Sequence, residues 1–170
     1  PSDLQFADGW HTPKAMSEDD LERVKAEFVS SSVRAVRLGF DVVELHAAHG
    51  YLLNQFTSPL SNRRVDQYGG SDISKRLKYP LEVFEAIKLR IPSHVALGAR
   101  ISGSDWVDGG LNSEEMIIFA GELEARGCHF VDVTSGQLDP RQQIKLAPGF
   151  NLPFSKKVKT ETEIAAIGVG

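Results

Sequence analysis

The stretch DVVELH, residues 41–46, alternates two kinds of side chain. Successive side chains of a β-strand point to opposite faces, so Val43 and Leu45 share one face. Glu44 and His46 fall on the other face, at its carboxyl end. The stretch therefore predicts a strand with one apolar face and one face that becomes polar toward the end of the strand.

Two later stretches repeat this pattern: VALGARIS (95–102) and FVDVTS (130–135). In each, small or polar side chains oppose a uniformly apolar face. Helices cover both faces of a doubly wound sheet, so both faces of its strands should be apolar. In a barrel, the apolar face packs against the helices and the other face points inward, toward a site at the carboxyl ends of the strands. The alternation favours a barrel over a doubly wound sheet.

Helical patterns separate the strands. Ser17 and Asp20 form a capping-box pattern at the start of the first helix, and Gly39 follows its end. Alternating strands and helices predict parallel strands with right-handed crossovers, an α/β fold. The expected helices cover residues 17–39, 75–89, 112–127 and 154–160, and the expected strands 41–46, 94–102, 128–135 and 164–170.

The composition is that of one globular unit, with 170 residues, 41% hydrophobic and 25% charged. A net charge of −4 without a basic patch argues against nucleic-acid binding. One cysteine, Cys128, excludes a disulfide or a cysteine-cluster metal site within the chain. No apolar run reaches the ~20 residues of a membrane span, and no signal pattern opens the chain. We expect a cytoplasmic protein with small-molecule ligands and no membrane partner, assembled as a homo-oligomer.

The chain opens on Pro1 and ends on the apolar run IAAIGVG, residues 164–170. A (β/α)₈ barrel needs eight strands and typically ~250 residues, and only four strands are predicted here. We therefore expect residues 1–170 to form the middle of a barrel.

His46 and His49 suggest three kinds of site. Zinc-binding pairs on a helix are four residues apart, whereas residues three apart on a strand point to opposite faces, which disfavours a metal site. Both histidines could be structural. Alternatively, with Tyr51, Asn54 and Gln55 just beyond, two neutral imidazoles could donate hydrogen bonds to one substrate oxygen while a phenol delivers a proton.

Arg100 also has two interpretations. It could form an ion pair with Glu44 or Asp132 inside the barrel. It could instead hold a fixed positive charge against an anion or an electron-rich ring, because arginine stays protonated in such a site. Gly98 and Ala96 beside it leave room for a flat group.

The block HAAHGYLLNQFTSPLSNRRVDQYGGS, residues 46–71, closely resembles the signature of the Old Yellow Enzyme family of FMN-dependent ene-reductases, in the branch with two active-site histidines. TPKAMSEDDL, GARISGSDW, VDVTSG and IGVG follow the family order along the chain. The resemblance implies a (β/α)₈ TIM barrel that binds FMN noncovalently. It further implies that NAD(P)H reduces the flavin, which then gives hydride to an activated alkene such as an enone or nitroalkene.

The resemblance also assigns roles to individual residues. His46 and His49 look like the pair that hydrogen-bonds the substrate's carbonyl or nitro oxygen, and Ala47 and Ala48 lie between them in the same wall of the substrate pocket. Tyr51 resembles the donor of a proton to the α-carbon.

A second role concerns the cofactor: Arg100 resembles the arginine that faces the N1–C2 oxygen edge of the flavin. The loop SPLSNRRVDQYGGS (58–71) is similar to the family's loop after the fourth strand, and its expected role is structural. Asn62, Arg63 and Asp66 should fix it by hydrogen bonds and an ion pair, and Gly69 with Gly70 should form a turn.

By the resemblance, the chain is the central part of one FMN-binding TIM-barrel domain, from its third helix to its seventh strand. Such a part is expected to bind FMN poorly by itself. Two alternatives stay open: the barrel of a larger iron–sulfur flavoenzyme of the dienoyl-CoA reductase or amine dehydrogenase type, and a non-catalytic barrel fragment that mediates assembly.

Overall fold

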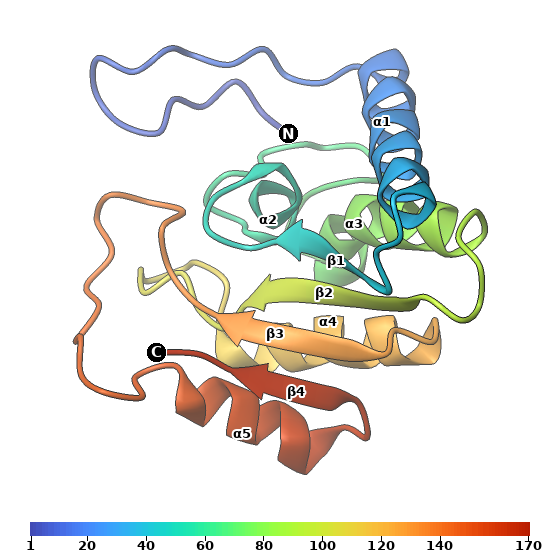
Figure 1. Cartoon of the computed structure of the whole chain (residues 1–170). Helices are drawn as coiled ribbons and strands as arrows, with labels where there is room; N and C mark the ends of the chain where they lie inside the picture. The colour runs from blue at the N-terminus through green and yellow to red at the C-terminus, as the bar shows by residue number, and fades with distance from the viewer.

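Four parallel strands form one sheet in the order β1-β2-β3-β4 in the computed structural model, which describes residues 1–170 (Figure 1). The helices and strands, in chain order, are α1 (Glu18–Arg37), β1 (Val42–Ala47), α2 (Leu52–Thr57), α3 (Ile73–Lys88), β2 (Ala96–Ser102), α4 (Ser113–Ala125), β3 (Phe130–Thr134), α5 (Leu152–Glu161) and β4 (Ala165–Gly168). None of the helices is both long and apolar enough to cross a membrane.

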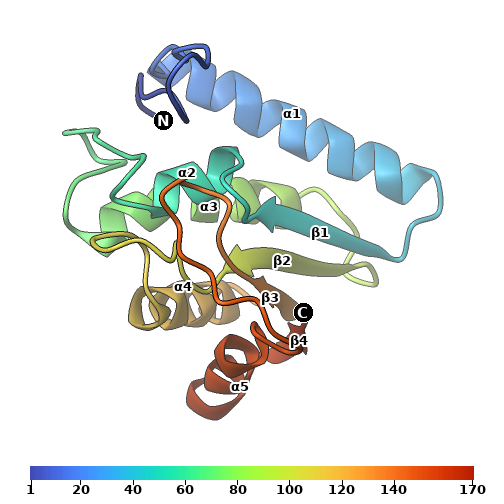
Figure 2. The same ribbon diagram turned by 90° about the vertical axis from the view of Figure 1, so that its left-hand side faces the viewer.

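The strand order and the helices distinguish the two predicted architectures. Each strand is added on the same side of the one before it, without the reversal of a doubly wound sheet. Helices α1, α3, α4 and α5 lie along one face of the sheet, and α2 lies at the end of β1 (Figure 2). The α/β fold with successive parallel βα units is confirmed, in the arrangement that a (β/α)₈ barrel uses.

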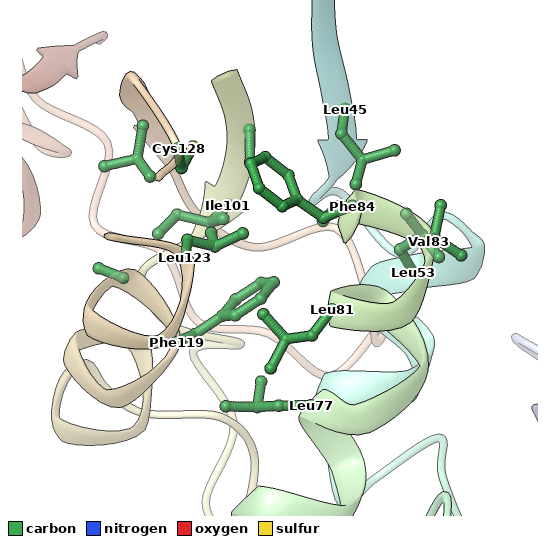
Figure 3. Close-up of a cluster of buried hydrophobic side chains, with 14 of the residues drawn as sticks. Leu45, Leu53, Leu77, Leu81, Val83, Phe84, Ile101, Phe119, Leu123 and Cys128 are labelled. Carbon is green, nitrogen blue, oxygen red and sulfur yellow. The ribbon is translucent and has the colours of Figure 1, made fainter. Parts of the chain in front are cut away.

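The apolar face of the sheet is buried under the helices. Leu45 on β1 and Ile101 on β2 point toward Phe84 of α3 and Leu123 of α4 (Figure 3). The opposite face stays open, and Val42 on β1 is half exposed. The predicted alternation is therefore confirmed: the helices cover the apolar face of the sheet, and the small and polar side chains lie on the other face.

The predicted helix caps are largely correct. The Ser17 hydroxyl accepts a hydrogen bond from the backbone of Asp20 in a complete capping box, and Asn112 caps α4 through Glu115. Helix α3 begins two residues earlier than predicted, because the Asp72 carboxylate accepts the Ser74 N–H. Helix α2 was not predicted.

The loop between α2 and α3 is tied down as expected, but by a different arginine. The Asn62 amide donates to the carbonyl of Phe56 in α2 and to the carbonyl of Tyr68 in the loop. Arg64, and not Arg63, forms the ion pair with Asp66, because the Arg64 side chain turns inward and also donates to a carbonyl of the N-terminal segment. The predicted Arg63 pair was wrong, and the turn at Gly70 is present with φ of 101°.

A buried arginine joins three helices. Arg76 of α3 is almost fully buried, forms an ion pair with Glu115 of α4 and donates to the carbonyl of Thr57 at the end of α2. Breaking a buried pair leaves an uncompensated charge, which costs more than the pair itself contributes.

We predict that Arg76→Ala lowers the free energy of unfolding by about 3 kcal/mol, because Glu115 and the Thr57 carbonyl lose their partner. Urea denaturation measures the change. Lys157→Ala removes a surface pair with Glu161 and is the matched control, expected to leave the midpoint unchanged. Equal midpoints for both variants would show that the Arg76 pair does not stabilise the fold.

Candidate functional site

The chain turns sharply where β1 ends. His49 and Gly50 both adopt the left-handed conformation, with φ of 59° and 70°. A side chain is strained there, so the turn needs support from neighbours. The His49 N–H donates to the Ser102 hydroxyl at 3.3 Å, and the Gly50 N–H donates to the Asn54 side-chain oxygen at 2.8 Å.

The turn brings together side chains that an extended strand would separate. The rings of His46 and His49 meet edge to face with their centroids 5.3 Å apart. The Tyr51 ring lies 5.2 Å from the His46 ring and is 64% exposed. Ala47 and Ala48, which lie between the two histidines in the sequence, are buried. Their contribution to substrate binding stays a prediction.

Thr134, at the end of β3, holds the His49 ring. The His49 Nε2 and the Thr134 hydroxyl oxygen are 2.9 Å apart, and Thr134 is the register neighbour of Ser102. Hydroxyls on two strands therefore fix the ring and the backbone of one histidine. Sequence reasoning placed Thr134 on the inward face but gave it no role. The sequence signal for this role was a hydroxyl side chain on the inward face of a strand, at its carboxyl end.

Burial and a nearby charge keep both imidazoles neutral. Loss of hydration lowers the pKa of His46 and of His49, and the Arg100 guanidinium lowers both further. Neutral imidazole has one N–H donor and one acceptor nitrogen. At pH 7 the two rings can therefore donate hydrogen bonds to a ligand oxygen without adding charge to the site.

Arg100 lies in one row with His46 and Asp132 across three strands. The Arg100 Nε is 3.6 Å from an Asp132 oxygen, so the ion pair considered from the sequence is present. It is not a hydrogen bond, and the buried Arg100 Nε and Asp132 Oδ1 have no hydrogen-bond partner. Burial, followed by repulsion from Asp132, raises the pKa of Glu44 on the same face.

The expected space beside Arg100 is partly filled. The Phe130 ring covers Gly98, where an added Cβ would collide with it. The expectation that Gly98 leaves room for a flat ligand was wrong, because the neighbouring strand supplies an aromatic ring at that position.

A cavity of about 430 Å³ adjoins the turn. His49, Gly50 and Tyr51 form one wall, and the other lining residues come from the segments 4–13, 55–61 and 137–139. No group of three or more histidine, cysteine, aspartate or glutamate side chains is arranged to hold a metal ion.

Comparison with known proteins assigns the sequence to a family. The model of the NADH:flavin oxidoreductase / NADH oxidase family matches residues 3–170. The chain is 38% identical over its whole length to an NADPH dehydrogenase of Geobacillus sp. (strain WCH70) and covers 49% of that protein. It thus spans about half the length of the curated relatives it matches.

Solved structures share the fold. An Old Yellow Enzyme homologue from Zymomonas mobilis superposes on 98% of the chain with a TM-score of 0.78, at 23% identity, and 48% of that protein is covered. A 2-naphthoyl-CoA reductase superposes on 96% of the chain with a TM-score of 0.87, at 24% identity, and 25% of that protein is covered. Both likenesses concern the arrangement of strands and helices.

The close packing of Gly50 yields a prediction. A Cβ at Gly50 would lie 2.5 Å from the Gln137 carbonyl oxygen, whereas Gly39 also has positive φ but open space around it. We expect Gly39→Ala to cost about 1 kcal/mol of stability and Gly50→Ala clearly more, because only the second variant adds a backbone collision. Thermal denaturation measures both, and equal losses would contradict the close approach.

The effect of Arg100 on the histidines yields another prediction. Arg100→Gln removes the charge that disfavours imidazolium, so the NMR titration midpoints of His46 and His49 should rise. Because their pKa values are lowered in the folded state, acidification below about pH 6.5 destabilises the wild-type fold, and the variant should lose less stability there. Arg126→Gln, at the C-cap of α4, is the control. Unchanged midpoints in Arg100→Gln would show that this charge does not reach the rings.

Proposed function

The chain belongs to the NADH:flavin oxidoreductase / NADH oxidase family, and from this premise we propose that the protein is an FMN-dependent NAD(P)H oxidoreductase that reduces C=C bonds activated by a carbonyl or nitro group. One observation supports the alkene chemistry above the others. Two neutral imidazoles and a phenol, from residues 46, 49 and 51, lie together at the carboxyl end of β1.

Arg100 fits a role in holding FMN. Its guanidinium lies on the open face of the sheet, keeps 30% of its side chain exposed, and has a buried Nε without a hydrogen-bond partner. A fixed cation with unused donors suits the electron-rich edge of a flavin ring. FMN, when bound and reduced by NAD(P)H, would supply the hydride that the C=C bond accepts.

His46 and His49 would orient and polarise the substrate. Each neutral ring offers one N–H. When the Thr134 hydroxyl donates to His49 Nε2, the His49 N–H is at Nδ1, and the two rings together can donate to a single carbonyl or nitro oxygen. These bonds strengthen as negative charge develops on that oxygen, so the pair stabilises the transition state more than the ground state. The Thr134 hydroxyl fixes the His49 ring, so little reorganisation is needed.

Tyr51 would complete the reaction. It lies at the start of α2, beside His46 and at the wall of the cavity. Its phenolic O–H can deliver the proton to the carbon next to the carbonyl, which makes it a general acid.

The proposal also includes the location and the assembly of the whole protein. We place it in the cytoplasm as a homo-oligomer, as expected from its sequence. Iron analysis distinguishes it from an iron–sulfur flavoenzyme. The one cysteine of residues 1–170, Cys128, is buried, and loss of hydration raises the pKa of its thiol to about 11. A flavin titration distinguishes it from a non-catalytic fragment.

The proposed activity is tested on the full-length protein, of which residues 1–170 form the central part, by adding FMN and recording the absorption spectrum and NADPH oxidation with cyclohex-2-enone. We expect a yellow protein whose NADPH oxidation depends on the enone. A colourless protein that never takes up FMN would contradict the proposal.

Tyr51→Phe separates the two half-reactions. Removing a general acid typically slows its step by about 10²–10⁴-fold, so alkene reduction should slow by that order. Flavin reduction by NADPH should change less than about twofold, because it needs no proton from Tyr51. Stopped-flow absorbance follows each half-reaction, and equal losses in both would argue against a proton-donor role.

A further inference from the structure

The cavity beside Tyr51 has an aromatic wall that the proposed chemistry does not use. Phe6 and Trp10 meet at 5.0 Å between ring centroids, tilted by 60°. They are 42% and 63% exposed, and both line the cavity with Leu4. Single exposed apolar side chains are common, but a cluster at the mouth of one cavity indicates a binding surface.

This wall faces the proposed reaction centre. The N-terminal segment lies beside the start of α1, toward the end of the molecule where the strands terminate (Figures 1 and 2). His49 and Tyr51 line the same cavity as Phe6 and Trp10, and Leu138 contributes from the loop after β3. A ligand with one end at His49 can therefore extend over the aromatic pair.

The cavity also lacks positive charge. None of its lining residues is a lysine or arginine. Its one carboxylate, Asp139, is paired with Arg141 through both oxygens, at 2.9 Å and 2.6 Å. An anionic substituent would find no lysine or arginine in the lining, and the neighbouring Arg141 is already paired with Asp139, so the cavity suits an uncharged group.

We propose that this cavity binds the uncharged aryl substituent of an α,β-unsaturated ketone, which stacks on Trp10 and Phe6 while its carbonyl oxygen meets His46 and His49. The inference rests on the proposed function and names its substrate class. A volume of about 430 Å³ falls within the range of drug-sized ligand sites, about 300–1,000 Å³. Aromatic rings in offset or tilted contact bind more strongly than their buried area alone predicts.

Equilibrium binding to the FMN-loaded, oxidised protein tests this without turnover. Calorimetry compares (E)-4-phenylbut-3-en-2-one with cyclohex-2-enone, and we expect the aryl enone to bind more tightly. In Trp10→Ala the affinity ratio of the two ligands should fall about tenfold, and in Phe6→Ala it should fall in the same direction. The 4-carboxylate derivative of the aryl enone should bind at least tenfold more weakly than its neutral parent.

The control is Phe40→Ala, an exposed aromatic residue between α1 and β1 and outside the cavity. It should leave the affinity ratio unchanged. The proposal is overturned if the aryl enone binds no more tightly than cyclohex-2-enone, if Trp10→Ala keeps the wild-type ratio, or if the carboxylate binds as well as the neutral ligand. If the binding pattern holds but neither enone is reduced by the reduced flavoprotein, the cavity assignment stands and the proposed function fails.

Discussion

The left-handed turn at His49 and Gly50 is the constraint on which the candidate site depends. In an extended strand, residues three apart face opposite sides, so His46 and His49 could not act on one atom. The turn is strained at His49, and the Ser102 hydroxyl and the Asn54 side chain hold it. Gly50 also allows the Gln137 backbone to approach closely. Residues from β2, α2 and the loop after β3 thus position a site whose proposed catalytic residues lie in one short segment of the sequence.

The electrostatic setting follows from the same arrangement. Burial lowers the pKa of both imidazoles, and Arg100, which the parallel register places beside His46, lowers it further, so both rings favour the neutral form. A neutral pair can donate to a ligand oxygen, whereas two imidazoliums beside an arginine would repel one another. The site therefore combines uncharged donors at the turn with one fixed cation on the open face of the sheet. That combination suits a substrate oxygen and a flavin edge side by side.

Much of the fold could be predicted from the sequence, because periodicity reports which face of a strand is buried and Ser17 and Asn112 report where helices begin. The prediction errors occurred where contacts between residues far apart in the sequence determine the structure. Helix α2 follows a turn that depends on partners from other strands, and the Phe130 ring over Gly98 follows from the register between β2 and β3. The ion pair of Arg64 rather than Arg63 depends on which side chain turns toward the N-terminal segment. The motif indicated His46, His49 and Tyr51, but the support from Thr134 requires the sheet.

The most direct measurement of the central claim is the carbonyl stretching frequency of bound ¹³C-labelled cyclohex-2-enone, recorded by isotope-edited infrared spectroscopy on the FMN-loaded protein. Two hydrogen bonds to one oxygen weaken the C=O bond, so the account predicts a lower frequency than in water. His46→Ala and His49→Ala should each lose part of that shift, and the double variant should lose the rest. The same frequency in the wild type and in all three variants would contradict the claim that these two imidazoles hold one substrate oxygen.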